Sequence, residues 1–159
     1  MAIERKPVIA IVGAGKCSKK LRDNAAIVAR YVAKNGGVVV CGGLEGIMEG
    51  AARGAWEGGG VSIGILPGED RNDANKFITY AIPTGFGEAR NIMVIRMADV
   101  VVAFPGKYGT LSEMAFALKA GKPVISISAW KVGEDIISMD DPTEAAEKAM
   151  ELAQAALEE

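Results

Sequence analysis

The chain has 159 residues, half of them apolar, which is enough for one well-packed domain over residues 1–159. A formal net charge of −2 gives no general attraction to nucleic acid or to anionic membranes. The absence of histidine excludes Ser-His-Asp triads, Cys-His pairs and HExxH zinc sites. No run approaches the roughly 18 apolar residues of a membrane span. We therefore expect a cytoplasmic protein with neither a membrane nor a nucleic-acid partner.

Five short apolar runs without polar alternation are typical of strands buried on both faces of a sheet. They cover residues 7–12, 37–41, 61–66, 99–104 and 123–128. The segments between them have helical spacing, and a last helix opens at Asp141 and Pro142. We place the other helices at residues 18–35, 46–58, 86–98 and 110–121. This alternation predicts a Rossmann-like three-layer α/β sandwich with a mainly parallel, doubly wound sheet.

One connection departs from the alternation of strands and helices. The ten residues between Leu66 and Phe77 are polar and turn-rich, and they are too few for a helical crossover. We therefore expect residues 77–82 to form a weaker element at the edge of the sheet.

Ligands of such sheets bind beyond the carboxyl ends of the strands, so the turns that follow the strands are the first places to search. The first turn, IVGAGKCS at 11–18, lacks the third glycine of a dinucleotide fingerprint and the Ser or Thr of a Walker A loop. Gly13 and Lys16 remain candidates for contact with a phosphate or a ribose.

The second turn has glycines at 42, 43 and 46 before an alanine-rich and glycine-rich helix. Gly42, Gly43 and Gly46 could let backbone amides approach an anion at the helix N-terminus. Gly50 and Gly54 have an equally good explanation, which is close packing of the helix.

The third turn, FPGKYGT, connects a buried strand to the helix expected at 110–121. Gly106 and Gly109 allow close approach of a ligand, and Thr110 places a hydroxyl beside unpaired helix amides. Lys107 adds a positive charge, and Tyr108 is a candidate for stacking. These features predict a cradle for a phosphate monoester.

Glu113 has two explanations. Thr110-x-x-Glu113 matches a capping box, in which the glutamate accepts a hydrogen bond from the N-cap amide and has no other role. Alternatively, the carboxylate lies beside a sugar and stabilises positive charge that develops when a glycosidic bond ionises. The stretch alone leaves both explanations open.

The stretch GEARNIMVIRMADVVVAFPGKYGTLSEMAFALKAGKPVI, residues 87–125, resembles the signature of the Lonely Guy family, which is often mislabelled as lysine decarboxylase. That family has a PGGxGTxxE motif after an Arg-Lys pair on the preceding helix. Arg90 matches the arginine and Glu113 the glutamate. The glycine turn at 42–50 resembles the second family motif, GGGxxGxMG.

The resemblance implies a Rossmann-like homodimer that hydrolyses the N-glycosidic bond of a nucleoside 5′-monophosphate to a base and ribose 5-phosphate. Under this hypothesis the third turn holds the phosphate of a nucleotide-like small molecule. Arg90 and Glu113 are the catalytic residues: Arg90 orients the substrate or leaving base, and Glu113 engages the ribose. The resemblance implies no metal and no redox cofactor.

Three positions depart from the family pattern. Asn91 stands where the family has lysine, Lys107 replaces the second glycine of PGG, and Leu44 replaces the third glycine of GGG. With these departures the chain resembles the branch that contains the molybdenum-cofactor carrier proteins, whose TGxGxxRN stretch is similar to residues 84–91.

Three functions therefore compete. The first is a phosphoribohydrolase acting on a nucleotide. The second is a carrier or sensor that binds a phosphorylated nucleotide or a molybdopterin-type cofactor without turnover. The third, DNA processing by analogy with the related fold of DprA, is opposed by the absence of excess positive charge.

A homodimer or larger homo-oligomer is also expected from the apolar segment Ile92–Ile95. The narrow alanine-leucine stripe of the last helix suits docking on the sheet, and this leaves residues 92–95 as a surface patch in need of a partner.

Overall fold

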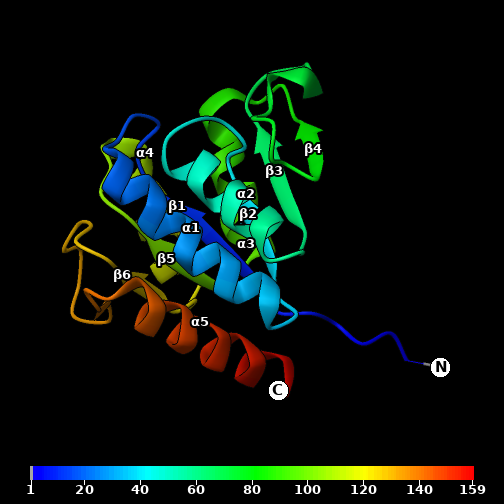
Figure 1. The fold of residues 1–159 in the computed structure, drawn as a ribbon. Helices are drawn as coiled ribbons and strands as arrows, with labels where there is room; N and C mark the ends of the chain where they lie inside the picture. The colour runs from blue at the N-terminus through cyan, green and yellow to red at the C-terminus, as the bar shows by residue number, and fades with distance from the viewer. Residues whose placement is uncertain (1) are drawn as a thin grey trace.

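A computed structural model describes residues 2–159, which form one sheet of seven parallel strands in the order β4-β3-β2-β1-β5-β6-β7 (Figure 1). The strands are β1 Val8–Val12, β2 Val38–Cys41, β3 Ser62–Leu66, β4 Tyr80–Pro83, β5 Val100–Ala103, β6 Val124–Ser126 and β7 Ile137–Ser138. The helices are α1 Lys19–Lys34, α2 Ile47–Glu57, α3 Arg90–Met97, α4 Tyr108–Lys119 and α5 Pro142–Leu157. The predicted Rossmann-like α/β fold is confirmed.

Helices cover both faces of the sheet, as the lack of polar alternation in the strands predicts. Helices α1, α2 and α5 cover one face, where alternate strand residues such as Ile9, Ile11 and Val39 pack against their alanines (Figure 1). Helices α3 and α4 cover the other face, where Val94 and Met114 pack against Val101.

The first helix begins and ends where its sequence signals are. Ser18 is the N-cap, and its hydroxyl accepts a hydrogen bond from the Leu21 amide at 3.2 Å. At the other end, Gly36 has a φ of +82°, and the Gly37 amide donates to the Val32 carbonyl at 2.9 Å. This is a glycine-dependent C-terminal cap, and it turns the chain directly into β2.

The two glycines of α2 serve close packing between helices. A Cβ on Gly50 would lie 3.0 Å from the Arg22 side chain, and one on Gly54 would lie 2.7 Å from the Ala26 Cα. Both neighbours belong to α1. Of the two explanations that the sequence leaves open for Gly50 and Gly54, the structure supports helix packing.

The order of the strands reverses direction at β1. From β1 the chain moves outward through β2, β3 and β4, then crosses back to place β5 on the other side of β1. The carboxyl ends of β1, β2 and β5 are therefore adjacent at the reversal, which is where doubly wound sheets bind ligands. As predicted, the last strand of the outward series, β4, lies at the edge, and its connection from β3 contains only a 3₁₀ turn at Arg71–Asp73.

Three local predictions need correction. Strand β7 was not predicted, because two residues in a polar segment carry no periodicity. The helix expected at 86–98 is a 3₁₀ turn at Gly87–Ala89 followed by α3. The segment 92–95 is not a continuous surface patch, because Val94 and Ile95 are buried against the sheet and only Met93 is exposed.

Candidate functional site

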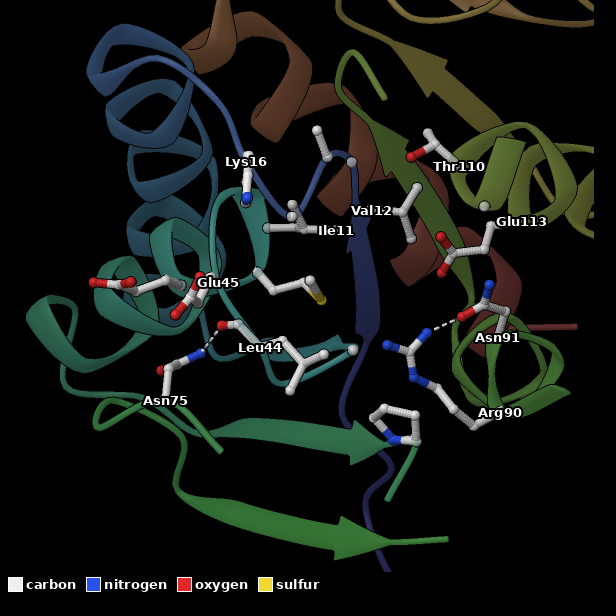
Figure 2. A pocket seen from close by; sticks show the side chains of 18 of the residues that line it. Ile11, Val12, Lys16, Leu44, Glu45, Asn75, Arg90, Asn91, Thr110 and Glu113 are labelled. Carbon is white, nitrogen blue, oxygen red and sulfur yellow. Dashed lines mark hydrogen bonds between the residues drawn. The ribbon is translucent and has the colours of Figure 1, made fainter. Parts of the chain in front are cut away.

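A cavity of about 1030 Å³ opens at the carboxyl ends of the strands, beside the reversal in strand order (Figure 2). Its lining comes from the turns after β1, β2, β3 and β5 and from the first turns of α3 and α4. Eight of the residues singled out in the sequence line it: Gly13, Lys16, Gly42, Arg90, Lys107, Gly109, Thr110 and Glu113. Segments far apart in the sequence thus contribute to one cavity.

Four other candidate residues lie outside the lining. Tyr108 is 78% exposed, and its ring stacks on Trp130 with the ring centroids 6.2 Å apart. Gly43 and Gly46 have φ angles of +79° and +65°, so they shape the turn after β2. Gly106 lies beneath Thr110.

Helix α4 begins at Tyr108, three residues earlier than the capping-box explanation requires. The N-cap is Lys107, and no side chain caps the first turn. Thr110 is therefore the third residue of the helix, so Glu113 cannot reach back to an N-cap amide. The capping-box explanation of Glu113 is wrong, and the first-turn amides of α4 have no side-chain partner among the described residues.

The Thr110 hydroxyl lies at this helix N-terminus. The residue is 3% exposed, and it belongs to the lining of the cavity. A Cβ on Gly106 would collide with the Thr110 hydroxyl and lie 3.1 Å from the Ala14 amide nitrogen. Glycine at 106 therefore keeps the turns after β1 and β5 in close contact beside Thr110.

Arg90 enters the cavity from the start of α3 and reaches over the end of β2. A Cβ on Gly42 would lie 2.8 Å from Arg90 Nη2, so the missing side chain makes room for the guanidinium. Arg90 Nη1 donates to the Asn91 side-chain oxygen, whereas the buried Nε has no hydrogen-bond partner among residues 2–159 (Figure 2). Burial lowers the pKa of Arg90, and the Glu113 charge opposes that shift.

Glu113 is 7% exposed and extends from α4 toward the cavity (Figure 2). No described residue donates a hydrogen bond to its carboxylate. Burial raises the pKa of Glu113 to about 7, and the nearby Arg90 charge opposes only part of this shift. The cavity thus contains a buried carboxyl group that changes charge near neutral pH.

The segment after β3 was expected only to lead to an edge element and was not assigned to the site, yet it forms the far end of the cavity. Pro67, Asp73, Asn75 and Lys76 line the cavity from this segment. The length of the connection was the signal that could have indicated this position. A polar connection too short for a helical crossover starts at the carboxyl end of β3, and part of it stays beside that edge of the sheet. Leu44, known from the sequence only as a departure from a motif, also lines the cavity.

The fold and the position of the cavity define the class: a Rossmann-like α/β protein with a small-molecule cavity at the carboxyl ends of its strands. Residues 6–156 match the SLOG cluster 4 family, and the chain belongs to that family. The narrower assignment to the Lonely Guy enzymes stays a prediction.

Comparisons with known proteins agree on the fold. An uncharacterized protein of Archaeoglobus fulgidus is 38% identical over 137 residues, covering 86% of this chain and 90% of that protein. The molybdenum cofactor binding protein of Rippkaea orientalis superposes with a TM-score of 0.86 at 33% identity, covering 92% of this chain and 96% of that one. The Moco carrier protein of Chlamydomonas reinhardtii has a TM-score of 0.86 at 30% identity, with 95% and 99% coverage.

A more distant likeness concerns the fold alone. DNA processing protein A of Helicobacter pylori superposes with a TM-score of 0.73 at 21% identity, covering 91% of this chain and 80% of that chain. Among residues 2–159, no helix combines the length and apolar character needed to cross a membrane.

Proposed function

We propose that the protein binds a phosphorylated cofactor of the molybdenum-cofactor class and carries it without turnover. The observation that carries this proposal is the uncapped N-terminus of α4, with Thr110 beside it in the lining of the cavity. The similarity to a molybdenum cofactor binding protein and to a Moco carrier protein supports the same function.

The phosphate of the ligand would bind at the first turn of α4. The unpaired amides and the helix dipole favour an anion there, and the Thr110 hydroxyl can donate a further hydrogen bond. Lys16 and Lys107 line the same cavity and add positive charge from exposed positions. A metal ion is not needed for this contact.

The charge state of Glu113 favours carriage over hydrolysis. Stabilising an oxocarbenium-like transition state needs an ionised carboxylate, whereas a carboxyl group with a pKa of about 7 is only about half ionised at neutral pH and is largely protonated below it. Asn91, a neutral residue, pairs with Arg90 in place of a second cation. These residues would retain a ligand without attacking it.

Calorimetric titration with isolated molybdenum cofactor tests the proposal. We expect the natural protein to bind the cofactor and Thr110→Val to bind it about tenfold or more weakly, because a hydrogen bond to a charged phosphate is lost. Ser112→Ala is the matched control: that hydroxyl donates to the Gly109 carbonyl at 2.7 Å and is not part of the cavity lining. Absence of binding, or equal affinity in Thr110→Val, would contradict the proposal.

A second candidate, nucleoside monophosphate phosphoribohydrolase, is supported by the presence of Arg90 and Glu113 in the same cavity as Thr110. Residues 110 and 113 are neighbours on one helix face, so a group attached directly to the phosphate would lie near Glu113. In this reaction water adds at the ribose carbon, the bond to the base breaks, and the base leaves with a proton. The rate would rise with pH through about 7, as Glu113 ionises.

Incubation with a panel of nucleoside 5′-monophosphates separates the two candidates. The carrier proposal predicts no release of base, followed by chromatography, from either the natural protein or Glu113→Gln. Release by the natural protein and not by Glu113→Gln would establish the hydrolase and overturn carriage without turnover.

A further inference from the structure

The two ends of the cavity differ in chemistry. The end beside β5 is polar, with the α4 amides and Thr110. The opposite end, over β2 and β3, combines the aliphatic side chains of Leu44, Met48 and Pro67 with the polar side chains of Asp73, Asn75 and Lys76. A ligand with a phosphate at the first end can therefore pack an apolar face on these aliphatic side chains and present polar edges to the side chains around them.

The separation of the two ends fits a particular size of ligand. Neighbouring parallel strands lie about 4.8 Å apart, so the β5 side of the cavity is roughly 10 Å from the end of β2 and roughly 14 Å from the end of β3. This is the length from a phosphate to the far edge of a planar ring that a short polyol or a sugar connects to it.

Asn75 holds the turn that carries Leu44. The Asn75 amide donates to the Gly43 carbonyl at 2.9 Å, and its side-chain nitrogen donates to the Leu44 carbonyl at 2.8 Å and the Gly43 carbonyl at 3.3 Å. Its side-chain oxygen accepts from the Phe77 amide at 3.0 Å. Figure 2 shows the Leu44 side chain directed away from Asn75 and into the cavity.

These hydrogen bonds give Asn75 a positioning role. Its side chain uses both polar atoms on backbone groups, so it has little capacity left for a ligand. The turn that it holds has glycines at 42, 43 and 46, and Gly43 has a φ of +79°. Such a turn has many accessible conformations unless a partner selects one.

We infer that Leu44, positioned by Asn75, is the specificity-determining contact for a planar heterocyclic ring at the β2 and β3 end of the cavity. The ring packs on the aliphatic side chain while the phosphate binds at α4. This inference rests on the proposed function and adds to it the residue that selects the ring of the ligand.

A matched pair of probes measures the ring contact separately from the phosphate contact. Neopterin 3′-monophosphate has a pterin ring on a phosphorylated polyol, and glycerol 3-phosphate has the phosphorylated polyol alone. We expect the natural protein to bind the first about tenfold or more tightly than the second. We expect Leu44→Ala to reduce that ratio about fivefold to tenfold, because apolar contact area is lost, and to leave the Kd of glycerol 3-phosphate unchanged.

Further variants separate the contact that Leu44 makes with the ring from the positioning of Leu44 by Asn75. Leu44→Met keeps an aliphatic side chain of similar volume and should keep most of the ratio. Asn75→Ala should reduce the ratio in the same direction as Leu44→Ala. Asn72→Ala, in the same segment and with an exposed side chain, should leave it unchanged.

Each other outcome has a definite meaning. If Leu44→Ala leaves the ratio unchanged, or weakens both probes equally, Leu44 does not contact the ring and the inference is wrong. If neither probe binds to the natural protein, the proposed phosphate site fails and the inference fails with it. If Leu44→Ala does not fold, Leu44→Met and Asn75→Ala decide the question. The inference is then wrong if Asn75→Ala has the same ratio of affinities for the two probes as the natural protein.

Discussion

Gly106 is the residue at which a single methyl group should have the largest effect on ligand binding. A Cβ there would lie 2.7 Å from the Thr110 Cβ and 3.1 Å from the Ala14 nitrogen, so the turns after β1 and β5 would separate. We predict that Gly106→Ala weakens binding of isolated molybdenum cofactor at least tenfold, measured by calorimetry. Gly133→Ala is the control, because its Cβ would meet only Leu118, at 4.0 Å. Equal affinity in the two variants would show that the turn is not at the binding site.

Glu113 should make the free energy of unfolding depend on pH. Its pKa rises from an ordinary value of 4.5 to about 7 on folding. Between these two values the unfolded chain ionises the group while the folded chain keeps it protonated, so stability falls as pH rises and the full penalty is present above about pH 7. We predict that Glu113→Gln stabilises the protein by roughly 2–3 kcal/mol more at pH 8 than at pH 5.

Urea denaturation at the two pH values measures this difference. Equal stabilisation at pH 5 and pH 8 would mean that the carboxyl group ionises normally in the folded protein. The cavity would then contain a permanent negative charge, and the argument for carriage from the charge of Glu113 would lose its basis.

At the scale of secondary-structure elements, Lys122 stabilises the helix that carries Arg90. Its ammonium group donates to the carbonyls of Ile95, Arg96 and Ala98 at 2.7, 2.9 and 2.6 Å, where α3 ends. We predict that Lys122→Met lowers the free energy of unfolding by roughly 1–3 kcal/mol, because carbonyl groups lose a charged donor. Lys119→Met, at an exposed position, should change it little. Equal effects in denaturation experiments would contradict this role.

The positions of the central strands were predictable because strands buried on both faces of a sheet have apolar side chains at nearly every position. Runs such as VVVC at 38–41 are apolar at every position, and the structure places β2 there. The start of α4 was less predictable. Thr110 and Glu113 match a capping box in sequence, but the turn at Gly106 and Lys107 lets the helix begin three residues earlier. A local pattern cannot show how closely the neighbouring β1 turn approaches.

The part of the candidate site that lies within local sequence patterns was predicted, and the part that depends on contacts between distant segments was not. Arg90, Thr110 and Glu113 belong to patterns within one stretch of sequence, and the structure brings them to one cavity. The contact between Asn75 and Leu44 joins residues 31 positions apart through backbone carbonyls, which leave no trace in a sequence pattern. Only the arrangement of the whole sheet places these two residues side by side.

For the whole molecule we predict a homodimer, by a surface that shares only Met93 with the segment 92–95. Met93 and Met97 on α3 and Phe116 on α4 are 36%, 40% and 38% exposed on helices that cover the same face of the sheet. Burying these side chains against a second copy would remove apolar surface from water. Sedimentation equilibrium should show a dimer at micromolar concentration, and Met97→Glu should shift it toward monomer. A natural protein that is monomeric under these conditions would refute the prediction.

The central claim is that this cavity holds a phosphorylated cofactor and returns it unchanged. The most direct measurement is gel filtration of the protein with isolated molybdenum cofactor, followed by denaturation of the protein peak and chromatographic analysis of the pterin released. We predict that the cofactor co-elutes with the natural protein, is recovered intact, and is lost from Gly106→Ala. Elution of the natural protein without the cofactor, or recovery of a cleaved product, would contradict the account.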